Sequence, residues 1–189
     1  MNALDLLFDR HSTPAKHLCA PPPDDTQLDI MLRAAMSAPD HAALVPWRFL
    51  IVREPALPAL GELWATAYAS HHPHAEPELV QRQREKIQRA PLLIGIISHL
   101  SENHPRVPEL EQHLAVAVAA GHILLAAQAL GYGAIWLSGE SCRDRHVSHA
   151  LGLSENEHLL GFINTGSIKG NQPLRTRQDP WPYTREWMG

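Results

Sequence analysis

The sequence predicts a protein of mixed α and β class, because helical and strand-like segments alternate along the chain. The clearest strand signal is residues 90–97, a nearly continuous aliphatic run typical of a strand covered on both faces. The clearest helix signal is residues 26–37, whose apolar positions share one face at Leu28, Leu32, Ala35 and Met36. Periodicity alone leaves two architectures open, a parallel doubly wound sheet and an α+β sandwich.

In chain order, the predicted helices span about residues 2–10, 26–37, 56–69, 76–89, 108–130 and 143–151. The predicted strands lie near residues 48–53, 92–98, 133–138 and 159–165. The proline-rich stretch 20–23 separates the first two helices, and Asp25 or Thr26 is the expected N-cap of the second. That helix stops at Pro39 and the first strand follows Pro46, since proline fixes φ and withholds a backbone donor.

Composition favours a single domain over residues 1–189, because a chain of this length with 44% apolar residues can bury a full core. The net charge of −4 gives no support for nucleic-acid binding. Two cysteines, Cys19 and Cys142, lack CxxC spacing and indicate a reduced, cytoplasmic setting, and no export signal is visible. Polar residues interrupt the longest apolar run, 114–130, so we expect no membrane span.

Thirteen histidines raise the question of a metal site, above all in the stretch His71-His72-Pro73-His74. Adjacent residues rarely converge on one ion, and no HExxH or paired-cysteine spacing accompanies them. We therefore expect a polar loop between two helices, and no metal. The GxSxG and Walker-type patterns of hydrolases and nucleoside triphosphatases are also missing from the sequence.

The segment 108–130 is rich in alanine, and no polar stripe survives in its C-terminal half. A helix that is apolar all round has to be buried on all sides. Two arrangements would bury it, the core of one chain or the centre of a homodimer. We favour the homodimer, because a chain of 189 residues has limited interior for such a helix.

Five short motifs in order carry a family resemblance. They are Arg10-His11-Ser12, Ala38-Pro39-Asp40, Pro46-Trp47, the stretch from Gly131 to Gly139 (GYGAIWLSG) after the alanine-rich helix, and the stretch from Gly161 to Gly166. Together they resemble the flavin-dependent nitroreductase family, in particular its short, single-domain NAD(P)H branch. The resemblance implies an α+β sandwich with a central mixed, mainly antiparallel sheet flanked by helices. It also implies a homodimer with FMN at the subunit interface.

The resemblance assigns the FMN phosphate to the segment Arg10, His11 and Ser12, where the commoner pattern has Arg-Arg-Ser. Without the resemblance, Arg10 would be a helix-end cation and Ser12 a turn residue. A phosphate role for the C-terminal pair Arg175 and Arg177 is implied too, with solvated surface charge as the alternative. The other implied cofactor contacts are Trp136, Leu137 and Ser138 from one subunit, and Ser37 and His41 from the other. The implied nicotinamide contacts are Ala126, Ala127, Gln128, Ala129, Leu130 and Gly131.

The loop 38–47 connects a helix to a strand, a place where rigid scaffolds often display ligand-binding groups. His41 gives it a titratable ring, although a lone loop histidine more often satisfies a backbone carbonyl. The resemblance implies hydride transfer from NAD(P)H through FMN to a nitroaromatic, a quinone or a similar small aromatic acceptor. No catalytic side chain is then required, because the flavin carries the chemistry. The alternative is a flavin-binding carrier or sensor without sustained turnover.

Overall fold

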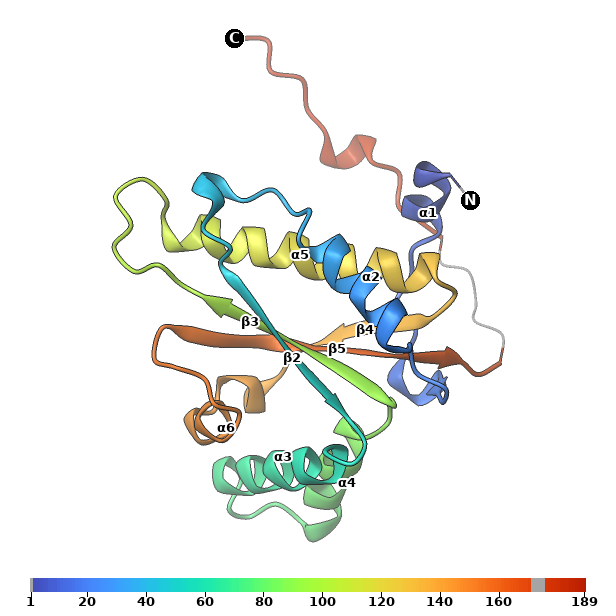
Figure 1. Cartoon of the computed structure of the whole chain (residues 1–189), viewed down its shortest axis with the longest axis vertical. Helices are drawn as coiled ribbons and strands as arrows, with labels where there is room; N and C mark the ends of the chain where they lie inside the picture. Colours follow the sequence, from blue (N-terminus) through green and yellow to red (C-terminus); the bar gives the residue numbers. More distant parts are fainter. Residues whose placement is uncertain (1, 171–175) are drawn as a thin grey trace.

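An antiparallel sheet of five strands forms the centre of the structure, a computed structural model that describes residues 2–170 and 176–189 (Figure 1). The strands are β1 (Leu18–Cys19), β2 (Trp47–Arg53), β3 (Leu92–His99), β4 (Gly133–Leu137) and β5 (Glu157–Ile168). Thr165 of β5 pairs with Leu92 of β3 and with Ala134 of β4, so these two strands flank β5 on opposite edges. The order β1-β5-β3-β2, with β4 also paired to β5, therefore makes β5 the central strand.

Helices cover both faces of the sheet (Figure 1). Those of the described residues are α1 (Ala3–Asp9), α2 (Asp25–Ala35), α3 (Leu57–His71), α4 (Pro77–Ile87), α5 (Glu109–Ala129) and α6 (Arg145–Ala150). One core joins α2 and α5 to Ile94 of β3, and the other joins α3, α4 and α6 to Leu93. Since neighbouring strand residues point to opposite faces, β3 is apolar from Leu92 to Ile97, as its sequence predicted.

The α+β class is confirmed, and each predicted helix and strand is present with ends shifted by a few residues. All strand pairs in the described part of the chain are antiparallel, so the expected parallel component is not seen there. The short β1 was not predicted. Asp24, rather than Asp25 or Thr26, caps α2, because its carboxylate accepts from Gln27 N at 2.8 Å while the Gln27 side chain accepts from Asp24 N at 2.9 Å.

Only one side of α5 is covered within the chain. Ala119, Ala120 and Ile123 are fully buried, whereas Leu114 and Val118 are 56% and 38% exposed. This chain alone therefore buries one side of α5, and the burial of the other side in a homodimer stays a prediction. By length and hydropathy α5 is the one helix, among the described residues, that could cross a membrane, yet its inner face belongs to the core over the sheet.

Candidate functional site

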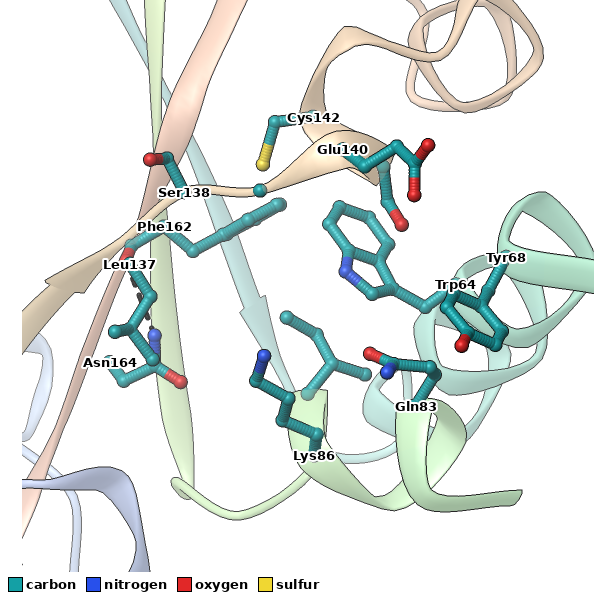
Figure 2. Close-up of a pocket in the computed structure, with 13 residues that line it drawn as sticks. Trp64, Tyr68, Gln83, Lys86, Leu137, Ser138, Glu140, Cys142, Phe162 and Asn164 are labelled. Carbon is teal, nitrogen blue, oxygen red and sulfur yellow. Dashed lines mark hydrogen bonds between the residues drawn. The ribbon is translucent and has the colours of Figure 1, made fainter. Parts of the chain in front are cut away.

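A cavity of about 250 Å³ lies between the end of β4 and the hairpin formed by α3 and α4 (Figure 2). Two of its lining residues, Leu137 and Ser138, are among those that the sequence assigned to a cofactor. The rest of the lining comes from both helices of the hairpin, from β5 and from the turn after β4: Trp64, Tyr68, Gln83, Lys86, Ile87, Gly139, Glu140, Ser141, Cys142, Phe162 and Asn164.

The polar lining of this cavity includes one unpartnered acceptor and several donors. Asn164 is 1% exposed, and its Nδ2 donates to the carbonyl of Phe162 at 3.2 Å, but its Oδ1 has no partner. A buried acceptor left without a donor costs free energy, so a ligand N–H that donated to this oxygen would be stabilising. Lys86 and Gln83 supply N–H donors from α4 (Figure 2). The cavity therefore suits a molecule with polar groups better than a purely apolar one.

Aromatic rings form the apolar wall of the cavity. The ring of Trp64 meets that of Phe162 edge to face, with centroids 5.5 Å apart. Gly161, next to Phe162, has a φ of 134°, and a Cβ there would lie 2.4 Å from the carbonyl oxygen of Leu137. Glycine at this position thus lets β4 and β5 approach closely where β4 delivers Leu137 and Ser138 to the cavity.

The cavity contains no activated thiol. Cys142 lines it, but burial raises the pKa of this thiol, which keeps it protonated. A larger cavity of about 610 Å³ lies beside α6 and the start of β5, and Cys142 borders that one as well. Arg143, Arg145, Glu155 and Glu157 give it charges of both signs, and none of the residues that the sequence assigned to a cofactor lines it.

The first predicted phosphate segment lies along the free edge of β4. The N–H of Thr13 donates to the carbonyl of Ala134 at 3.0 Å, and the N–H of His11 donates to Gln128 Oε1 at 3.2 Å. Arg10, the C-cap of α1, and Ser12 are half-buried beside these contacts. From Ala134 to Ser138 the strand advances about 13 Å, so this segment and the cavity sit at the two ends of β4.

The C-terminal segment returns to the same place. Arg177 is exposed, and its Nε lies 3.5 Å from the carbonyl oxygen of Phe8 in α1. In Figure 1 the chain passes α1 here before it leads away from the sheet. Arg177 of the C-terminal segment therefore lies near the end of α1, where Arg10 is the C-cap, and the shared phosphate role of these two arginines stays a prediction. Arg175 lies outside the described residues.

Ser37 and His41 contact α5 at different points along its length. The hydroxyl of Ser37 donates to the carbonyl of Ala34 at 2.7 Å and lies 3.1 Å from His122 Nδ1, while His41 Nδ1 lies 2.7 Å from Glu111 Oε2. Glu111 and Gln128 are 17 residues apart on one helix, or about 25 Å. One chain therefore does not bring His41 and His11 together. The neighbouring Ala42, Ala43 and Val45 all have positive φ, a costly backbone for such residues.

The stretch predicted to meet nicotinamide has a clear structural role. Ala127 is fully buried in the core and presents nothing to a ligand. Gly131, with a φ of 84°, ends α5, and the N–H of Tyr132 closes the turn on the carbonyl of Ala127 at 2.9 Å. Gln128 binds the His11 backbone. The other residues of this stretch, Ala126, Ala129 and Leu130, are half-buried or exposed, and their nicotinamide role stays a prediction.

Sequence reasoning missed most of the α3–α4 wall, including Trp64, Tyr68, Gln83 and Lys86. One signal was available. Gln83, Lys86 and Ile87 are spaced i, i+3, i+4 and so share a face of α4, and Ile87 is the one buried residue of that helix. This spacing places a polar pair beside the residue that anchors α4 in the core.

Comparison with known proteins decides the family, since residues 7–167 match the model of the nitroreductase family. The chain belongs to the nitroreductase family. The "Putative NAD(P)H nitroreductase YdjA" of Escherichia coli K12 is 34% identical over 188 residues, which cover 97% of this chain and 98% of that protein. The predicted family is therefore confirmed.

Solved structures agree on the fold of this nitroreductase family member. A nitroreductase-like family protein from Bacillus cereus superposes with a TM-score of 0.83 at 17% identity, over 100% of this chain and 97% of that one. A nitroreductase with bound FMN from Bacteroides fragilis gives a TM-score of 0.71 at 21% identity, over 95% of both chains.

Proposed function

We propose that this nitroreductase family member is an FMN-dependent NAD(P)H oxidoreductase that reduces a small, flat aromatic acceptor such as a nitroaromatic or a quinone. The observation that carries the proposal is the cavity at Leu137 and Ser138, with its unpartnered acceptor Asn164 Oδ1 and its donors on α4. The full-length similarity to YdjA, a putative NAD(P)H nitroreductase, supports the use of NAD(P)H, and the FMN in the Bacteroides fragilis structure supports FMN as the cofactor.

The residues present fit FMN in chemistry. A flavin ring offers an N–H that could donate to Asn164 Oδ1, and its carbonyl edge needs donors such as Lys86 Nζ and Gln83 Nε2. Arg10, Ser12 and Arg177 would hold the phosphate, for which guanidinium groups are the preferred partners. The buried Nε2 of His11, which has no partner, adds one more polar group at that end.

When bound, FMN accepts a hydride from the nicotinamide and passes reducing equivalents to the acceptor. The residues of the chain would orient the flavin ring and stabilise the charge that it takes up. The ammonium group of Lys86 places a positive charge in the cavity wall, where it would stabilise negative charge on a bound ring, and the carboxylate of Glu140 lies in the same wall. Trp64 and Phe162 exclude water from one side of the cavity. No side chain has to act as nucleophile, in keeping with the protonated Cys142.

The proposal includes a homodimer that completes two sites. The cavity is smaller than the ~300–1,000 Å³ of typical ligand sites, as half of a shared site would be. His41 lies about 25 Å along α5 from His11, so both can serve one flavin only if they come from different subunits. The exposed apolar face of α5, formed by Leu110, Leu114 and Val118, offers the surface for such contact.

Residues 1–189 would form a single FMN-binding domain in the cytoplasm. In it, α5 would be a core and interface helix rather than a membrane span.

The purified protein tests the function directly. We expect absorbance in the flavin region, release of FMN rather than FAD on heating, and sustained oxidation of NADH or NADPH with a nitroaromatic. A single reduction without turnover would favour the carrier or sensor. A colourless protein that takes up no added FMN would overturn the proposal.

A further inference from the structure

The tip of the α3–α4 hairpin is not held by apolar burial. From Tyr68 to Lys86 every residue is half-buried or exposed, between the buried side chains of Ala67 and Ile87. The base of the hairpin belongs to the core over β3 and β5, since Leu57, Leu60 and Trp64 are buried there. The position of the tip therefore depends on polar contacts.

Two consecutive histidines supply such contacts. His71 Nε2 lies 2.6 Å from Asp144 Oδ2, and His72 Nε2 lies 2.9 Å from Glu140 Oε2. Glu140 begins the short 3-10 turn Glu140–Arg143 that follows β4, and Asp144 comes directly after that turn. Both ends of the turn are thus tied to the end of α3.

The two carboxylates are built to stay charged. A hydrogen bond from His72 lowers the pKa of Glu140, with His71 and Arg143 adding to the effect. For Asp144 burial acts in the opposite direction, but hydrogen bonds from Val147 N and from His71 outweigh it and lower the pKa. Asp144 also caps α6 through Val147, so its position is fixed independently of the hairpin.

His72 also contacts the cavity wall on its own helix. Its ring stacks on that of Tyr68, with centroids 4.4 Å apart and planes tilted by 37°. Tyr68 and Glu140 both line the cavity (Figure 2). One histidine therefore fixes two lining residues that come from different elements.

We infer that His71 and His72 are positioning residues that hold the α3–α4 hairpin against the turn after β4 and so limit the size of the electron acceptor. The acceptor part of this inference rests on the proposed function. With both contacts in place the tip stays close to the turn after β4, and the space left beside the flavin ring favours single-ring acceptors. Without them the tip, which has no buried residue of its own, moves outward and admits larger fused rings.

The test compares the double variant His71→Ala/His72→Ala with the wild type and with His74→Ala, an exposed histidine of the same loop. Hydrogen exchange of the amides of residues 68–76 is measured on the protein without FMN. Values of kcat and KM are measured on the FMN-loaded enzyme with nitrobenzene and with anthraquinone-2-sulfonate. We expect the amide exchange rates of the double variant to rise about threefold to tenfold. We expect kcat/KM for the anthraquinone to rise by a similar factor, mainly through a lower KM, while kcat/KM for nitrobenzene changes less than about twofold.

His72→Gln keeps an N–H donor and should restore much of the wild-type selectivity, which a purely destabilising change would not do. If the double variant fails to fold, His72→Gln is measured in its place and should keep the exchange rates and the selectivity near those of the wild type. If the amides of the double variant exchanged at the wild-type rate, the histidines would not hold the hairpin. If they exchanged faster but the selectivity between the two acceptors did not change, the histidines would have no role toward the acceptor. If the wild type bound no FMN, the proposed function and the acceptor role would both fall, while the exchange rates would still decide the tie.

Discussion

Arg48 and Glu157 form a two-pronged ion pair between strands that are not neighbours in the sheet. Arg48 Nε lies 2.6 Å from Glu157 Oε1, and Nη2 lies 2.8 Å from Oε2. Arg48 is near the start of β2, Glu157 begins β5, and β3 runs between them. The Glu157 side chain is only 5% exposed, so this pair anchors the start of the central strand beside a turn in which Ser154 N also donates to Oε2.

This pair predicts a loss of stability in acid. The hydrogen bond from Arg48 lowers the pKa of Glu157 to about 2, against an ordinary 4.5, although burial opposes the shift. A carboxyl with a lowered folded-state pKa contributes fully above about pH 4.5 and loses its contribution as the pH falls toward 2. We expect on the order of 2 kcal/mol from this pair, discounted because Arg48 is partly exposed.

Denaturant unfolding of Arg48→Met at several pH values checks this. The variant should be destabilised at pH 7 and should lose less stability than the wild type between pH 4.5 and 2.5. Arg33→Met is the matched control, because the Arg33–Asp29 pair is exposed on one helix and should contribute little. Parallel pH curves for Arg48→Met and the wild type would refute the assignment.

Local sequence patterns predicted most of the helices and strands, because burial of one or both faces requires apolar residues at regular intervals along each element. The apolar run of β3 and the stripe of α2 are direct consequences of the layers that cover them. The sheet order was out of reach of periodicity, since nothing local in β5 shows that three other strands pair with it. The family resemblance was needed to choose the sandwich.

The site was predicted unevenly for a similar physical reason. Leu137 and Ser138 belong to a short, ordered motif and do line the cavity. Gln83 and Lys86 lie on a charged helix whose sequence resembles any solvated surface, so only the packing of that helix shows their role. His41 and His11 are far apart in one chain, and a single sequence carries no record of which subunit each serves.

Asn164 offers a test that separates cofactor binding from stability. Asn164→Leu removes the unpartnered Oδ1, so the protein without FMN should be as stable as the wild type or more stable. FMN affinity should fall by roughly 1–3 kcal/mol, measured by titration calorimetry, because the flavin would lose its acceptor. A large loss of stability with unchanged affinity would show that Asn164 is structural.

Arg10 and Arg177 should contribute to FMN affinity through its phosphate. We expect Arg10→Ala to weaken binding by about 1.5–3 kcal/mol and Arg177→Ala to weaken it as well, with binding of riboflavin changed little. Arg106→Ala, an exposed arginine in the loop before α5, is the control. Unchanged FMN affinity in Arg10→Ala would leave Arg10 as a helix-end cation.

Assembly is best tested on the outer face of α5. Val118→Glu and Leu114→Glu should produce folded monomers, seen by sedimentation, because these side chains are exposed in one chain and would be buried at the interface. Ala119→Glu and Ala120→Glu cannot serve, since both alanines are fully buried within the chain and the variants should simply unfold. Leu79→Glu on α4 is the control for an exposed leucine. A wild type that sediments as a monomer would exclude the dimer.

His41 decides whether the strained loop before β2 serves the flavin. Its contact with Glu111 joins two side chains that are 54% and 47% exposed, and such a pair contributes about 0–1 kcal/mol to stability. His41→Ala should therefore leave the melting temperature nearly unchanged. If His41 reaches the flavin of the partner subunit, the same variant should shift the flavin absorbance and reduction potential, because a polar neighbour of the ring is lost.

Glu111→Gln separates the two roles of the histidine. It removes the carboxylate partner but keeps the imidazole, so it should reproduce any effect that arises from the His41–Glu111 contact alone. We expect Glu111→Gln to move the flavin spectrum less than His41→Ala does. Equal spectra in the wild type and His41→Ala, with a lowered melting temperature, would instead make His41 a structural loop histidine whose only task is to hold this loop against α5.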